Sequence, residues 1–162
     1  IIDELEASML LYFTGRSRSS AAIIDEQKKN TVEGNIDAIE AMHRIKQSAV
    51  DMKLAVLKGD MVSFANILGK AWEDKKKMAG AISNPMIQEA FNVAVAAGAK
   101  AGKVSGAGGG GFIMFFVEPT RKKEVINALN KLNGFVMPFN FTEGGAHGWK
   151  IYPTDKVSTL SR

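Results

Sequence analysis

The first two thirds of the chain contain apolar residues that recur every three or four positions, the spacing of one helix face. This pattern predicts helices over 16–30, from Asn35 to a stop at Gly59, from Asp60 through Trp72, and from Asn84 to Gly98. In the second of them the apolar stripe consists of Ile39, Met42, Ile45, Ala49, Met52 and Val56. Gly59 and Gly98 are suited to end helices, while Asp60 and Asn84 are suited to cap the next helix start.

Strand patterns occur at both ends of the chain. Short apolar runs predict buried strands over 8–13 and 112–117. Residues 135–141 alternate, and Pro138 within them indicates an edge strand. A helix is expected between Pro119 and Gly134, and a last strand over 147–152. This order predicts an α+β fold, with a mostly antiparallel sheet of about four strands and helices packed on one face.

Composition narrows the function classes. The chain has 162 residues, of which 46% are hydrophobic and 23% charged, as in one ordinary globular domain. The net charge of +4 is mild, and the lysine run 75–77 is interpreted as a solvated helix face, so no nucleic-acid partner is expected. Apolar stretches are too short to span a membrane. The absence of cysteine excludes disulfides and thiolate chemistry and is compatible with the cytoplasmic location that we expect.

One segment stands out as a candidate binding site. Residues 106–111 contain five glycines in six positions, preceded by Ser105. Such a density indicates positive φ angles, close approach of a ligand, or backbone amides that bind an anion. The alternative is a turn in which the glycines serve only tight backbone packing. The spacing also fits G-x-G-x-x-G, but we expect the loop to follow a long helix and to enter a strand, which is the wrong context for a dinucleotide.

The remaining candidates are weaker. Arg16 and Arg18 follow the first strand and are suited to bind a phosphate, although they equally fit an exposed helix start. His43 and His147 have no partners at ligand spacing, so no metal site is predicted. The sequence shows no catalytic triad, and we assign no catalytic residue in this chain.

The glycine segment KVSGAGGGGFIMFF resembles the third conserved motif of the GHMP kinases. The resemblance implies a ferredoxin-like C-terminal domain over 1–153, with an inserted helical segment and a tail over 154–162. The segments LLYFTGRSRSSAAII and GGAHGWKIY are similar to a sugar-phosphate branch that includes heptose 7-phosphate kinases. An opening at Ile1 rather than Met agrees with a piece of a longer polypeptide.

The resemblance also implies an activity. The complete enzyme would transfer the γ-phosphoryl group of MgATP to the anomeric hydroxyl of a heptose 7-phosphate, in nucleotide-heptose biosynthesis. The loop residues that would face the cleft are Ser105, Gly106, Ala107, Gly108, Gly109 and Gly110. Arg16 and Arg18 would bind the substrate phosphate.

The family's ATP loop, P-x-x-x-G-L-G-S-S, is absent from these residues. ATP and Mg²⁺ would therefore be bound mainly by an N-terminal domain, which is the expected partner, and this chain alone would be inactive. The alternatives are a GHMP kinase for another sugar, such as fucose or galactose, and a non-catalytic small-molecule-binding module.

Overall fold

The architecture is that of a computed structural model, which describes residues 1–16, 20–138 and 140–150. Its elements, in order, are α1 (Ile2–Ser8), β1 (Met9–Phe13), α2 (Ser20–Val32), α3 (Ile36–Lys58), α4 (Met61–Met78), the 3₁₀ helix η1 (Gly80–Ile82), α5 (Pro85–Ala97), β2 (Ala99–Val104), β3 (Phe112–Val117), η2 (Pro119–Arg121), α6 (Lys122–Leu129) and β4 (Phe135–Met137).

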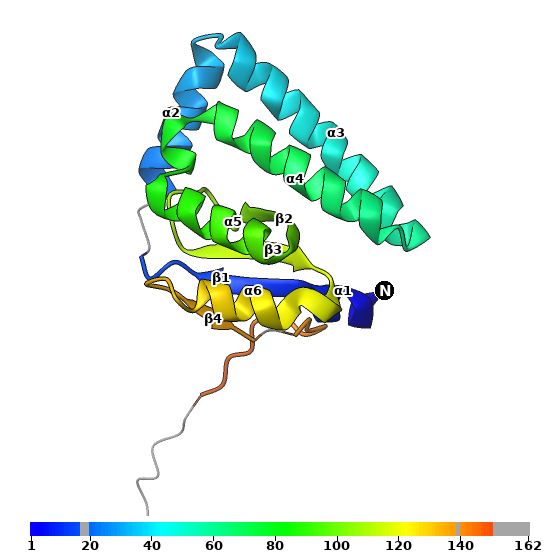
Figure 1. Cartoon of the computed structure of the whole chain (residues 1–162). Coiled ribbons are helices and arrows are strands. Elements are labelled where there is room, and N and C mark those ends of the chain that lie inside the picture. Colours follow the sequence, from blue (N-terminus) through cyan, green and yellow to red (C-terminus); the bar gives the residue numbers. More distant parts are fainter. Residues whose placement is uncertain (17–19, 139, 151–162) are drawn as a thin grey trace, which may run out of the picture.

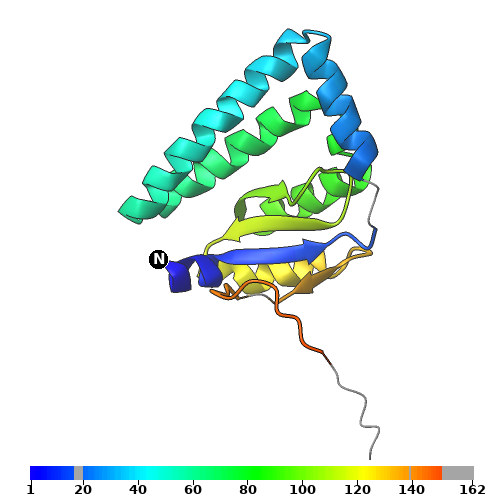
Figure 2. The same cartoon turned by 180° about the vertical axis from the view of Figure 1, so that it is seen from behind.

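The four strands form one sheet in the order β2-β3-β1-β4, and every neighbouring pair is antiparallel. Figure 1 shows α5 and α6 against one face of this sheet, and Figure 2 shows the sheet from the other face. The α+β fold with an antiparallel sheet is therefore confirmed. The chain's N-terminus leads through α1 directly into β1, a central strand.

Alternate residues of the strands build the main core. On the face toward α5 and α6, Leu10 of β1 pairs with Phe115 of β3, and Tyr12 pairs with Ile113. All four are buried and pack with Ile87 and residues of α6. Burial of large apolar side chains at about 25 cal/mol per Å² is the main stabilising term of such a core.

The opposite face of the sheet is also apolar but is only partly covered. Met9, Ala101 and Phe116 lie there and pack against Phe64 and Leu68 of α4. Farther along the same face, the rings of Phe13, Phe112 and Phe135 contact one another, with centroids 5.1 and 5.4 Å apart in the two pairs that share Phe13. Phe135 remains 50% exposed. Helices thus cover one face fully and the second only beside β2 and β3.

The inserted helices α3 and α4 lie side by side above the sheet (Figure 1). Their ends agree with the sequence: the Asn35 side chain accepts from the Ala38 amide, Asp60 accepts from the Ser63 amide, and Gly59 adopts φ 68°. The predicted stripe of α3 is less buried than expected. Met42 of the stripe is 38% exposed, whereas its neighbour Ala41, outside the stripe, is fully buried.

Two strand predictions were wrong. Residues 99–104, where the sequence predicts no strand, form β2, while 147–150 are irregular and exposed. The fourth strand of the sheet is therefore β2 and lies before the glycine segment. β4 is shorter than predicted, but its position at a sheet edge confirms the argument from Pro138. The predicted tail 154–162 lies outside the described residues.

Within the described part of the chain, no helix combines the length and the apolar character needed to cross a bilayer.

Candidate functional site

The glycine segment is the turn of the hairpin that joins β2 to β3. The Ser105 amide donates to the Phe112 carbonyl at 2.8 Å and closes the hairpin. The segment therefore follows a strand, and the expectation that it follows a long helix was wrong. A strand also comes after it, so the turn does not lead into a helix as the dinucleotide motif requires.

The second half of the loop is held by the chain's own backbone. The Gly109 amide donates to the Ile82 carbonyl at 2.9 Å, and the Asn84 side-chain amide donates to the Gly109 carbonyl at 3.0 Å. The Gly111 amide donates to the Arg16 carbonyl at 2.8 Å. These contacts connect the loop to η1, to the start of α5 and to the turn after β1.

Gly108 shows why this half requires glycine. Its φ is 116°, in the left-handed region that side chains avoid, and a Cβ there would lie 2.8 Å from the Ile82 carbonyl oxygen. Gly109 and Gly110 are buried as well. Close backbone packing therefore explains glycine at 108, and also at 110, where a Cβ would lie 2.7 Å from the Arg16 carbonyl oxygen.

The first half of the loop is open. Ser105 and Gly106 are exposed, and a Cβ at Gly106 would meet no atom within 4 Å, although its φ of 80° still favours glycine. Within the described residues, the amides of Gly106, Ala107 and Gly108 donate to no acceptor. Successive unpaired amides in a turn are suited to bind an anion.

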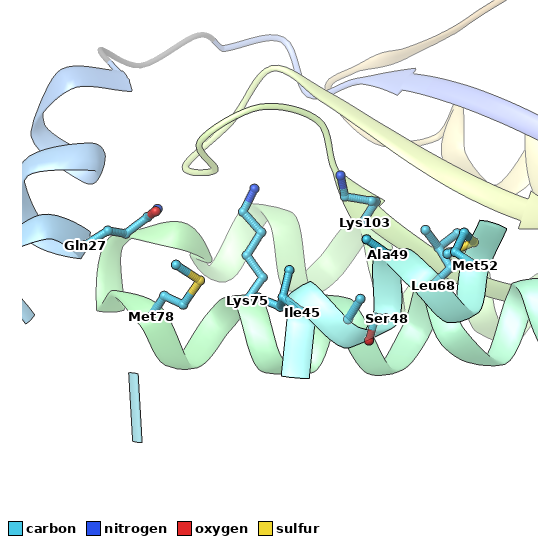
Figure 3. A pocket seen from close by; sticks show the side chains of 10 residues that line it. Gln27, Ile45, Ser48, Ala49, Met52, Leu68, Lys75, Met78 and Lys103 are labelled. Carbon is cyan, nitrogen blue, oxygen red and sulfur yellow. The ribbon is translucent and has the colours of Figure 1, made fainter. Parts of the chain in front are cut away.

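Two lysines lie beneath this open half. Figure 3 shows the ammonium groups of Lys75 and Lys103 pointing toward the loop from α4 and β2. The Lys75 Nζ donates to the Gly106 carbonyl. Burial lowers the pKa of Lys75, and the positive charge of Lys103 lowers it further.

Both lysines line a groove of 510 Å³ between α3, α4 and β2. Its wall is largely apolar and includes Ile45, Met52 and Leu68, with Gln27 of α2 at one end (Figure 3). A charged group beside such a wall is poorly solvated, which strengthens its interaction with an opposite charge.

Sequence reasoning missed both lysines. Lys75 was interpreted as part of a solvated run, yet it lies seven positions after buried Leu68 and so shares its face of the helix. That spacing, and the position of Lys103 immediately before the loop, were the available signals.

Of the two predicted arginines, Arg16 lies beside the loop and Arg18 lies outside the described residues. The Arg16 carbonyl accepts from the Gly111 amide, while its exposed side chain borders a different pocket of 450 Å³ with Glu89 and Asn133. The structure thus brings the Arg16 backbone, not its guanidinium, into contact with the glycine loop.

Within the described ranges, no group of three or more His, Asp or Glu side chains is arranged to hold a metal ion. Glu26, which lies near η1, accepts from the Gly80 amide at 2.8 Å. Its carboxylate therefore serves to fix the backbone at the start of η1.

Comparison with known proteins shows that the chain that carries this loop is similar to kinases. Residues 52–133 match the family model described as GHMP kinases C terminal. The chain is 45% identical to D-glycero-alpha-D-manno-heptose 7-phosphate kinase of Campylobacter jejuni, over 93% of this chain and 44% of that protein. It is 31% identical, over 64% of its length, to L-fucokinase/L-fucose-1-P guanylyltransferase of Bacteroides fragilis, of which it covers 11%.

Solved structures agree with this assignment. A D-glycero-D-manno-heptose 1-phosphate kinase from Bacteroides thetaiotaomicron superposes with a TM-score of 0.62 at 56% identity, covering 94% of this chain and 38% of that one. Mevalonate kinase of L. major gives a TM-score of 0.69 over 76% of this chain and 37% of that one, at 15% identity, a likeness of fold alone. The chain thus spans less than half the length of these relatives.

Proposed function

The chain belongs to the GHMP kinase family, and from this premise we propose that it is the C-terminal part of an ATP-dependent sugar-phosphate kinase. The complete protein transfers the γ-phosphoryl group of ATP to the anomeric hydroxyl of D-glycero-D-manno-heptose 7-phosphate, in nucleotide-heptose biosynthesis. Residues 1–153 form its C-terminal domain, and the protein is cytoplasmic, as is its nucleotide donor.

The observation that carries this proposal is the 45% identity to a heptose 7-phosphate kinase over nearly the whole chain. The names of the two heptose relatives differ in the position of the phosphate, 7 in one and 1 in the other. Of these two acceptors we propose the heptose 7-phosphate, which would be phosphorylated at its anomeric carbon. A phosphorylation assay with the 7-phosphate and the 1-phosphate distinguishes the two acceptors directly.

In this proposal the chain contributes positioning and charge. Phosphoryl transfer depends mainly on aligning donor and acceptor and on stabilising the charge of the transferred group. The open amides of Gly106, Ala107 and Gly108 are suited to that second task, because they are fixed donors that need no reorganisation. Ser105, Gly109 and Gly110 belong to the same cleft-facing loop, and the arginines Arg16 and Arg18 remain candidates for the substrate phosphate.

The partner of this domain is the N-terminal half of the same polypeptide, which supplies most of the ATP site and the Mg²⁺ ligands. The relatives are more than twice as long as the chain, which leaves room for such a domain. We propose that it packs on the uncovered sheet face, where Phe135 and Met137 are 50% and 38% exposed. Large exposed apolar patches of this kind mark interfaces.

The test is a phosphorylation assay of the complete polypeptide with MgATP. The acceptors are D-glycero-D-manno-heptose 7-phosphate, the 1-phosphate, L-fucose, galactose and mevalonate. We expect strong preference for the 7-phosphate, and no turnover when the purified 162-residue chain replaces the complete protein. Preference for another acceptor would overturn the substrate. No turnover from the folded complete protein would favour a non-catalytic binding module.

Fucose is the second candidate, because the chain is also similar to an L-fucokinase over 64% of its length. The two candidates differ in charge, since fucose carries no phosphate. A kinase for fucose would therefore be insensitive to neutralising the basic residues around the loop, apart from effects on ATP.

A further inference from the structure

We propose that Lys75 and Lys103 form a phosphate-binding subsite at the rim of the apolar groove, on the open side of the glycine loop. The inference rests on the proposed function only for the source of the phosphate, which is either the sugar phosphate or the nucleotide.

The two side chains reach this point from separate, well-fixed elements. Lys75 lies three positions after Trp72 on α4. The Trp72 ring is buried and stacks on Phe91 of α5, with ring centroids 5.3 Å apart. Lys103 lies opposite Met114 in the register of β2 and β3, on the sheet face that α4 covers. Both side chains therefore point toward the glycine loop from the same side, as Figure 3 shows, and the Lys75 Nζ donates to the Gly106 carbonyl.

Three nearby lysines have a counter-ion, whereas Lys70 of α4, like Lys75 and Lys103, forms no ion pair within the described residues. Lys76 pairs with Glu73 at 2.8 Å, Lys77 lies 3.4 Å from Asp74, and Lys100 pairs with Glu118 at 3.1 Å. Within the described part of the chain, neither Lys75 nor Lys103 forms an ion pair. Two partly buried cations side by side repel each other, and the repulsion is relieved when an anion lies between them.

A phosphate is the anion that fits this geometry. It carries up to two charges, which matches two lysines, and three oxygens that accept hydrogen bonds. The glycine loop borders this end of the groove, because the Gly106 carbonyl accepts from the Lys75 Nζ. The groove's apolar wall, with Ile45 and Met52, leaves Lys75 and Lys103 as the positive groups that an anion meets there.

The experiment uses the complete protein and calorimetric titration with three probes: ATP, D-glycero-D-manno-heptose 7-phosphate and inorganic pyrophosphate. The variants are K75M and K103M, which keep the apolar stem of the side chain and remove its charge. K70M and K100M are the matched controls, because Lys70 is exposed on α4 and Lys100 is exposed on β2. K103R preserves the charge and should retain binding.

We expect K103M and K75M each to weaken binding of one phosphate ligand by about tenfold or more. Loss confined to the heptose phosphate assigns the subsite to the acceptor, and loss confined to ATP assigns it to the nucleotide. Pyrophosphate keeps the test independent of the proposed kinase, because its binding reports the subsite even if no acceptor is phosphorylated. Folded variants that bind all three probes as tightly as wild type overturn the proposal.

A second readout separates binding from a structural role. NMR titration of the Lys75 ammonium should give a pKa below the ordinary lysine value in the free protein. The pKa should rise when pyrophosphate is present, since a nearby anion favours the charged form. A Lys75 that serves only to hold the Gly106 carbonyl would titrate identically with and without the ligand, and this outcome contradicts the subsite.

Discussion

At the scale of single residues, Gly108 and Gly110 are the loop positions at which a Cβ would lie under 3 Å from a backbone oxygen, and Gly108 is the better test because its φ is 116°. A Cβ there would lie 2.8 Å from the Ile82 carbonyl oxygen and 2.9 Å from the Ile82 Cα, both backbone atoms that cannot move away cheaply. We expect Gly108→Ala to lower the free energy of unfolding by about 2 kcal/mol, from this contact and from the positive φ together. Urea denaturation of the complete protein measures it.

Gly106→Ala is the matched control. It has the same left-handed strain but no atom within 4 Å of its new Cβ, so its loss should be about 1 kcal/mol. Equal losses at the two positions would show that the contact with Ile82 is not what limits Gly108.

Tyr12 gives a prediction on pH. Its hydroxyl is buried and accepts from the Gly134 amide at 3.0 Å. Burial raises the pKa of Tyr12 above its ordinary value of 10.0, the nearby Glu89 raises it further, and the Gly134 bond opposes them. Because the unfolded chain ionises first, the stability due to Tyr12 is intact below pH 10.0 and is lost as the pH rises through the folded-state pKa.

The test for Tyr12 is the difference between two stability profiles. Wild type should lose stability between pH 9.5 and 11.5, roughly the range around a tyrosine pKa, more steeply than Tyr12→Phe does. The variant keeps the ring in the core, so lysine titration is common to both proteins and cancels. Parallel profiles would contradict the prediction.

Gly108 and Lys75 also show which features of the site could not be predicted from the sequence. The density of glycines identified the loop, but the partner that excludes a side chain at 108 is Ile82, and only the fold brings the two together. Similarly, the sequence shows Lys75 only as one member of a charged run, whereas the packing of α4 on the sheet directs its side chain toward the glycine loop. Contacts between segments far apart in the sequence determine both the glycine requirement at 108 and the environment of Lys75. The local amino-acid composition carries no information about such contacts.

At the scale of elements, Asn84 links α5 to the loop. Its side-chain oxygen caps the helix by accepting from the Ile87 amide at 3.0 Å, while its nitrogen donates to the Gly109 carbonyl. Asn84→Ala removes both bonds and should cost about 1 kcal/mol or more of stability. Asn84→Asp retains the cap and loses only the donor.

The pair of variants separates the two roles of Asn84. Asn84→Asp should unfold nearly as wild type does, yet faster hydrogen exchange at the Gly109 and Gly111 amides should reveal a loosened loop. If exchange in Asn84→Asp were unchanged, the bond to the Gly109 carbonyl would have no part in ordering the loop.

Among the elements, the ends of α3, α4 and α5 were best predicted from the sequence. Gly59, Asp60, Asn84 and Gly98 all occupy the cap positions that their chemistry indicated. β2 was missed because AKAGKV is rich in alanine, glycine and lysine, which strands disfavour, and it is a strand only through pairing with β3. The strand predicted over 147–152 failed for the converse reason: its described residues, 147–150, pair with no strand.

At the scale of the whole molecule, the uncovered sheet face gives a prediction on domain contact. Phe135→Lys places a charge on this face, and in the complete protein it should loosen the packing of the two halves. Increased binding of a hydrophobic dye and faster limited proteolysis would report the change. Val32→Lys, at an exposed apolar residue of α2, is the control and should leave both unchanged.

The two tryptophans of this chain occupy opposite environments. Trp72 is 4% exposed beneath the loop-bearing end of the sheet, whereas Trp149 is 80% exposed. Their fluorescence should therefore separate into a blue-shifted component that acrylamide hardly quenches and a red-shifted one that it quenches readily. Replacing Trp149 with Phe leaves Trp72, stacked on Phe91, as this chain's own optical reporter of how α4 packs on α5.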